Sequence, residues 1–161
     1  MTLNPDANIR FGRLPEISPD EILAHMNDPR VAQNMPLLTA KWDRPRVAEF
    51  VMAKEACWQR DGLGHWAILS ETVYVGWGGF QKEGDEWDFG LVLKPECFGL
   101  GLRITKQAIA FARADQRIAF VTFLLPTSRT RLGALARLGA RFVDAISYDG
   151  AEYLKYRLDT E

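Results

Sequence analysis

The stretch that most constrains the fold runs from residue 88 to residue 112, and it predicts a strand, a glycine-rich turn and a helix. Residues 89–93 form an apolar run of strand length, and Pro95 cannot donate to a β-ladder, so the strand should end before it. Gly99 and Gly101 then permit a backbone that other residues would strain. The residues that follow recur with helical spacing, at Leu102, Thr105, Ala108, Ile109 and Ala112.

A helix that begins directly after a glycine turn is suited to bind an anion. Its first N–H groups lack partners within the helix, and the helix dipole favours negative charge there. We therefore expect a phosphorylated cofactor at this turn. The spacing is neither that of a P-loop nor the three-glycine pattern of a Rossmann site, and the strand lies in mid-chain. From these residues alone, a turn that needs glycine only for its geometry is an equal alternative.

Composition narrows the classes of partner. The 161 residues carry a net charge of −1, which provides no field to attract nucleic acid or an anionic membrane. We expect neither partner, and we expect no metal site because His25 and His65 lack ligand spacing. Two cysteines suggest no disulfide framework, and no apolar run reaches membrane-spanning length. With no secretion signal in the first residues, these features favour the cytoplasm.

The remaining patterns predict one α+β domain over residues 1–161. Ser18 and Glu21 read as a capping box that starts one helix, and Asp43 and Gly62 read as the two caps of another. Three strand-like segments follow at residues 65–70, 72–80 and 87–93, and a buried strand is expected at 118–125. A helix from about residue 128 and a hairpin turning at residues 149–150 complete the chain.

The segment Leu93-x-Pro95-x-x-Phe98-Gly99-x-Gly101 resembles the acyl-CoA-binding motif of the GNAT superfamily of N-acetyltransferases. It is most similar to the branch that contains the ribosomal-protein-alanine acetyltransferases. Residues 65–80 resemble two strands of that branch, and residues 128–142 resemble its final helix and turn, so the similarity covers roughly residues 60–158. The resemblance implies a central mixed, mostly antiparallel twisted sheet of about seven strands flanked by about four helices.

The resemblance also implies how acetyl-CoA would be held. Backbone amides in the turn would bind the pyrophosphate, at Phe98, Gly99, Leu100, Gly101, Leu102 and Arg103. Backbone groups of the preceding strand would bind the pantetheine arm, at Leu91, Val92 and Leu93. Ser128 would hold the same arm and Arg131 would contact the nucleotide phosphate. Glu96 departs from the family pattern, in which glutamine or arginine usually begins this turn.

Asp88 matches the position at which many relatives carry an acidic residue, and it is the predicted general base. An ordinary aspartate has a pKa of about 3.9, so it needs burial or a water relay to act as one. Trp87 and Glu86 beside it are predicted to line the acceptor site. Gly90 is expected either at a strand bulge or under a packed aromatic ring.

A general acid is missing at its usual place, because Leu135 occupies the position at which relatives use tyrosine. Tyr148, Tyr153 and Tyr156 are the candidate replacements. The resemblance implies an N-acetyltransferase that acts by direct transfer in a ternary complex, with a small-molecule or peptide amine as acceptor. Family habit suggests a homodimer. The alternatives are a catalytically silent acyl-CoA-binding domain of the same fold and a nucleotide-binding regulator.

Overall fold

The computed structural model describes residues 6–33, 35, 40–127 and 133–160, and its centre is a seven-stranded sheet. The strands are β1 (Ile9–Gly12), β2 (His65–Ser70), β3 (Val73–Glu83), β4 (Glu86–Leu93), β5 (Phe120–Pro126), β6 (Arg141–Tyr148) and β7 (Ala151–Asp159). The helices are α1 (Pro19–Met26), α2 (Pro29–Ala32), α3 (Arg44–Asp61), α4 (Gly101–Ala114) and α5 (Gly133–Leu138), with 3-10 helices η1 (Leu14–Glu16) and η2 (Pro95–Leu100). The expected α+β class is confirmed.

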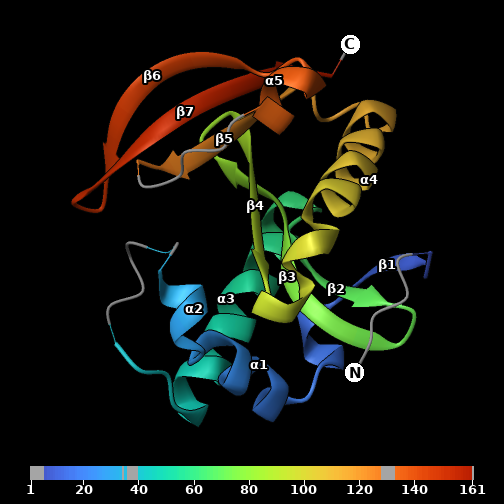
Figure 1. The fold of residues 1–161 in the computed structure, drawn as a ribbon, viewed down its shortest axis with the longest axis vertical. Coiled ribbons are helices and arrows are strands. Elements are labelled where there is room, and N and C mark those ends of the chain that lie inside the picture. Colours follow the sequence, from blue (N-terminus) through green and yellow to red (C-terminus); the bar gives the residue numbers. More distant parts are fainter. Residues whose placement is uncertain (1–5, 34, 36–39, 128–132, 161) are drawn as a thin grey trace.

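The strands lie in the order β1-β2-β3-β4-β5-β7-β6, and β4 with β5 is the one parallel pair in this sheet (Figure 1). Helix α4 connects these two strands, as a parallel crossover requires. Their ladder joins residues 87–89 to residues 121–123 and then stops. Since β4 continues to Leu93 and β5 to Pro126, the two strands part from each other in mid-sheet.

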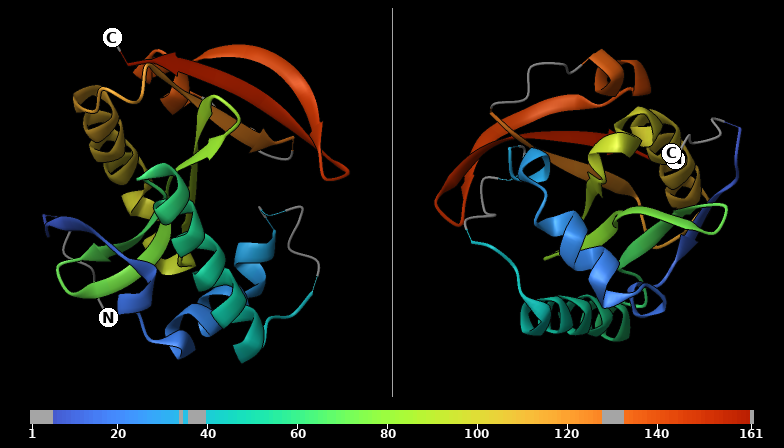
Figure 2. Two further views of the ribbon diagram at one scale, coloured as in Figure 1. Left: turned by 180° about the vertical axis from the view of Figure 1, so that it is seen from behind. Right: turned by 60° about the horizontal axis from the view of Figure 1, so that its bottom comes forward.

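Two apolar cores cover the two faces of the sheet. One core lies against α4 and contains Trp87, Phe89, Leu93 and the inward face of that helix. The other core contains Ile22 of α1 and Val47 of α3, with Ala67 and Leu69 of β2. Figure 2 shows α1 and α3 together, at the end of the molecule away from the β6–β7 hairpin. Successive residues of β4 therefore face different helices.

The helix caps were predicted with mixed success. The Asp43 carboxylate accepts from the Arg46 amide, 2.9 Å away, and Gly62 ends α3 in the left-handed conformation, as expected. The capping box at Ser18 is wrong, because Ser18 makes no side-chain cap. Glu21 instead approaches Lys94, with 3.8 Å between their charged atoms. Glu21 therefore forms a tertiary ion pair in place of the local hydrogen bond of a capping box.

The hairpin at the other end of the sheet is confirmed, with positive φ at both Asp149 and Gly150. Its strand β6 forms one edge of the sheet and is exposed over most of its length. The predicted homodimer would use such an edge, and it stays a prediction. In the described part of the chain, no helix is long and apolar enough to span a membrane.

Candidate active site

In the described part of the chain, the parting of β4 from β5 leaves backbone groups of β4 without a partner strand. The Lys94 amide donates to the Val75 carbonyl of β3, 2.9 Å away. Because a strand turns alternate residues to alternate neighbours, the backbone groups of Val92 also face β3. Those of Leu91 and Leu93 then face the opening toward β5. Of the three residues expected to contact an extended arm, these two present their amides and carbonyls to it.

The glycine turn is built as η2 running directly into α4. Gly101 has ordinary helical angles, and Gly99 does not have a positive φ, so backbone strain does not explain either glycine. Among the described residues, a Cβ on Gly99 would meet no atom within 4 Å, and one on Gly101 would make an ordinary contact with Leu93. Neither geometry nor internal packing requires glycine here, which favours close approach of something outside the chain.

One of the backbone amides predicted to bind the pyrophosphate already donates a hydrogen bond within the turn. The Gly101 amide donates to the Phe98 carbonyl, so it has a partner within the turn. The side chains of Phe98 and Leu102 are about half exposed beside it, and the Arg103 guanidinium donates to the Ala7 carbonyl. Ser128 and Arg131, the other two predicted cofactor contacts, lie outside the described residues.

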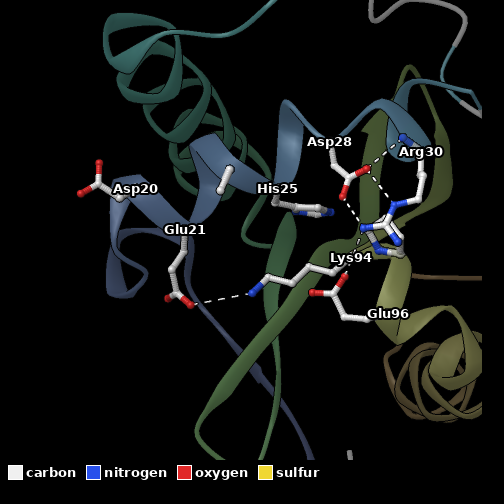
Figure 3. Close-up of a pocket in the computed structure, with 9 residues that line it drawn as sticks. Asp20, Glu21, His25, Asp28, Arg30, Lys94 and Glu96 are labelled. Atoms are coloured by element: carbon white, nitrogen blue, oxygen red, sulfur yellow. Dashed lines mark hydrogen bonds and ion pairs between the residues drawn. The ribbon is translucent and has the colours of Figure 1, made fainter. Parts of the chain in front are cut away.

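A charged pocket of about 380 Å³ lies between α1 and the residues that follow β4 (Figure 3). It is lined by Lys94, Pro95 and Glu96, by residues of α1, and by Asp28 and Arg30. The Glu96 carboxylate extends toward Arg30, with 4.0 Å between their charged atoms. The one acidic residue that departs from the family pattern in the turn is therefore directed at a guanidinium.

Asp88 lies in the short segment of β4 that pairs with β5, on the face opposite Trp87 and Phe89. The buried hydroxyl of Thr122, its register partner on β5, donates to its carboxylate at 2.9 Å. Burial raises the pKa of Asp88 to about 7, and the charges of Glu83 and Glu86 act in the same direction, whereas the Thr122 hydrogen bond opposes them. Asp88 can therefore hold or release a proton near neutral pH.

Glu86 and Trp87, the two residues predicted to line the acceptor site beside Asp88, lie on opposite faces of β4. Glu86 shares its face of β4 and pairs with Lys155 of β7 at 2.6 Å. The prediction that Trp87 lines an acceptor pocket is wrong, because its side chain is 5% exposed and packs in the core under α4. Residues one apart on a strand point to opposite faces, so adjacency to Asp88 in sequence placed Trp87 on the wrong side.

Of the two alternatives expected at Gly90, a strand bulge or a packed aromatic ring, the bulge is absent. The ladder between β3 and β4 runs without a register shift from Glu86 to Leu93. The opening arises because β5 diverges after Phe123, its last partner on β4 being Phe89. The nearest atoms to a Cβ on Gly90 would be Cε1 and Nε2 of His65, each 3.8 Å away. An imidazole thus lies against β4 where the opening begins.

Several residues of this region escaped the sequence reasoning. Thr122 is a polar residue in an otherwise apolar strand. Because a buried hydroxyl needs a hydrogen-bond partner, its position in the sequence already indicated a polar neighbour on an adjacent strand. Lys54 of α3 donates to Gln81, the register partner of Asp88 on β3, at 2.9 Å. Burial lowers the pKa of Lys54 to about 8. The sequence predicts that Lys54 lies on a helix, but it does not indicate which strand that helix packs against.

The three tyrosines predicted as candidate general acids lie on the last hairpin in different surroundings, and Leu135 occupies the usual position of the acid. Leu135 is partly buried against the core under α4, and Tyr156 packs against the same core. Tyr153 is buried, and Tyr148 is 42% exposed on the hairpin, where the nearby charge of Glu83 raises its pKa. Cys97 is buried and burial raises the pKa of its thiol, which does not suit a nucleophile. No group of three metal-ligating side chains occurs among the described residues.

Comparisons with known proteins identify the family. The family model for the acetyltransferase (GNAT) domain matches residues 13–141, well over half of the chain. No curated protein sequence matches. Many solved structures share the fold, among them RimL, a ribosomal L7/L12 alpha-N-protein acetyltransferase in complex with coenzyme A, at 14% identity and a TM-score of 0.76, covering 98% of this chain and 97% of that one.

Two further solved structures show the same fold. Spermidine N-acetyltransferase from Vibrio cholerae, in complex with CoA and spermine, is 8% identical with a TM-score of 0.73, covering 98% of this chain and 97% of that one. The microcin C7 self-immunity acetyltransferase MccE, in complex with acetyl-CoA and AMP, is 12% identical with a TM-score of 0.75, covering 96% and 93%. At these identities the similarity shows the fold alone.

Proposed function

The chain belongs to the family of acetyltransferase (GNAT) domains, and from this premise we propose that it transfers an acetyl group from acetyl-CoA to a primary amine. The transfer is direct, in a ternary complex, and the acceptor is a small-molecule or peptide amine. Structural neighbours with acetyl-CoA or CoA bound support the choice of donor. Cytoplasmic location and homodimer formation stay predictions.

The observation that carries the proposal is the position of Asp88 beside the opening between β4 and β5. The glycine turn lies at one end of this opening and Asp88 at the other. A donor with its phosphates at the turn and its arm along Leu91 and Leu93 would bring its thioester near Gly90. The Leu91 amide is our candidate to donate to the oxyanion that forms during transfer.

Asp88 is the proposed general base. As a carboxylate it accepts one proton from the acceptor ammonium, and the amine then attacks the thioester carbonyl. A base with a pKa near the working pH is well matched to this task, since enough of it is ionised while it still binds the proton. Glu86 is proposed to attract the cationic acceptor from the same face, while Lys155 fixes its carboxylate.

The main alternative, a silent acyl-CoA-binding domain, differs in turnover and not in donor binding. Asp88→Asn should lose turnover and keep donor binding if the chain is an enzyme, with a loss of roughly 10²- to 10⁴-fold for a missing general base. A silent domain would show no turnover in the wild type with any amine of a panel of peptides, polyamines and aminoglycosides.

Thermal unfolding with acetyl-CoA, CoA and ATP tests the donor site directly. A ligand at a hundred times its Kd adds about 2.7 kcal/mol of stability, so the wild-type midpoint should rise with acetyl-CoA and CoA but not with ATP. Gly101→Glu should abolish this rise by placing a carboxylate at the turn. A glutamate in the first turn of α4 is favourable for the helix itself, so loss of binding would not reflect loss of the fold.

Met52→Glu is the matched control, because Met52 is 72% exposed on α3, which packs on the other face of the sheet. It adds the same charge and should leave the acetyl-CoA response intact. No response in the wild type, or an equal response in Gly101→Glu, would contradict the proposed donor site. An equal response to ATP would favour a nucleotide-binding regulator.

A further inference from the structure

His65 lies beside the opening although it belongs to a distant strand. The register places His65 of β2 opposite Gly79 of β3, and Gly79 opposite Gly90 of β4. Because Gly90 carries no side chain, the imidazole can extend past β3 toward β4, whereas a Cβ on Gly79 would meet the Trp66 ring on the other face. Its Cε1 and Nε2 atoms each lie 3.8 Å from the position that a Cβ on Gly90 would occupy. Gly90 is the first residue of β4 beyond the ladder with β5.

His65 is buried and lies among aromatic side chains. The Trp58 indole donates to the His65 carbonyl at 2.9 Å, and the Trp77 ring lies 5.4 Å from the imidazole. His65 is 8% exposed, and its Nδ1 is buried without a hydrogen-bond partner among the described residues. A buried polar atom without a partner is destabilising, and an apolar side chain at this position would avoid that cost. Packing alone therefore does not account for a histidine.

We propose that His65 is a second proton-transfer residue of this site, carrying a proton from the acceptor nitrogen to the departing thiolate. The inference rests on the proposed acetyl transfer. His65 lies over Gly90, whereas Asp88 lies two residues farther from the glycine turn on the same face. A donor that enters from the turn therefore places its sulfur nearer His65 and its acyl carbon nearer the amine bound at Asp88.

The proton balance closes with these two groups. Asp88 takes one proton from the ammonium, and the nitrogen lone pair forms the new bond to the carbonyl carbon. When the carbon–sulfur bond breaks, its electron pair goes to sulfur while the nitrogen still holds a proton that it must lose. Neutral His65 accepts that proton and gives it to the sulfur, so the ring ends neutral and the products are an amide and a thiol. Asp88 then releases its proton to solvent, which restores the carboxylate.

Burial suits the ring to this task. It lowers the pKa of His65 well below its usual value, with a smaller contribution from the charge of Lys54 on α3. The ring is therefore neutral at rest, and its imidazolium form readily gives a proton to a thiolate. Among the described residues, the charged group that acts on this ring is Lys54 of α3, whose ammonium donates to Gln81 of β3. His65 would provide the acid that Leu135 cannot.

Two variants separate proton transfer from packing. His65→Phe fills the site with an apolar ring, and we expect it to unfold at or above the wild-type midpoint, to keep the acetyl-CoA response and to lose turnover roughly 10²- to 10⁴-fold. His65→Ala leaves a space of imidazole size. Free imidazole should restore its turnover, and a series of substituted imidazoles should restore it to a degree that follows their pKa. His25→Ala, which removes a buried imidazole from α1, is the control and should not respond to imidazole.

The outcomes distinguish the two proposals. If Asp88→Asn loses turnover while His65→Phe keeps it within threefold, His65 is a packing residue and the acetyltransferase proposal stands. If imidazole rescue of His65→Ala is absent or independent of imidazole pKa, proton transfer by His65 is likewise overturned. If the wild type releases no CoA thiol with any amine of the panel, the acetyl transfer fails and the role of His65 with it.

Discussion

Replacing Asp88 by asparagine should stabilise the protein at alkaline pH, although the residue is proposed to be essential for turnover. The asparagine Oδ1 can accept the same hydrogen bond from Thr122, so the substitution removes the charge and little else. The fold disfavours that charge, because burial raises the pKa of Asp88 from 3.8 to about 7. Active-site groups tuned for chemistry commonly carry such a stability cost.

The magnitude follows from the two pKa values. At 1.36 kcal/mol per pH unit, the difference between 3.8 and about 7 corresponds to an upper limit of about 4 kcal/mol. Asp88 retains some exposure, so we expect ~2–4 kcal/mol. Between about pH 4 and pH 7 the native state binds more protons than the unfolded state, so wild-type stability falls as pH rises through this window. Above it the full penalty persists.

Urea unfolding of the wild type and Asp88→Asn at pH 4.5, 6 and 8, followed by tryptophan fluorescence, measures this difference. The difference in stability should be smallest at pH 4.5 and largest at pH 8, where the variant should be the more stable protein. Thr122→Val is the complementary variant, because it removes the hydrogen bond that favours the carboxylate. It should lower stability more at pH 8 than at pH 4.5. A stability difference between Asp88→Asn and wild type that is constant with pH would refute the reasoning.

Two further predictions concern the opening and its chemistry. A Cβ on Gly78 would lie 2.3 Å from the Gly90 carbonyl oxygen, so Gly78→Ala should lose more than ~3 kcal/mol of folding stability or fail to fold. Gly99→Ala should stay within ~0.5 kcal/mol of the wild-type stability, because the described residues leave its Cβ free of contact. Calorimetry of both variants measures these changes, and a Gly78→Ala protein as stable as the wild type would contradict the prediction. The kcat/KM of the wild type should fall tenfold per pH unit below about pH 7, because Asp88 must be ionised, and a pH–rate profile that keeps this limb in Asp88→Asn would assign it to another group.

The sequence determined the elements whose causes are local. Asp43 and Gly62 cap α3 because a carboxylate reaches the first free amides and glycine adopts the left-handed conformation. Asp149 and Gly150 close the last hairpin for similarly local reasons. The order of strand, glycine turn and helix after Asp88 also followed from a few neighbouring residues. Such features depend on contacts within a few positions, which a sequence displays directly.

Only the tertiary structure decided what surrounds Asp88. The opening exists because β5 leaves β4 after Phe89, which depends on how whole strands diverge and not on a bulge at Gly90. Trp87 was assigned to the wrong face because proximity in sequence does not fix which face is the site. The same packing raised the pKa of Asp88 and brought His65 of β2 past β3 to Gly90 of β4. Burial and strand register depend on contacts between residues far apart in the sequence, so no local sequence pattern predicts them.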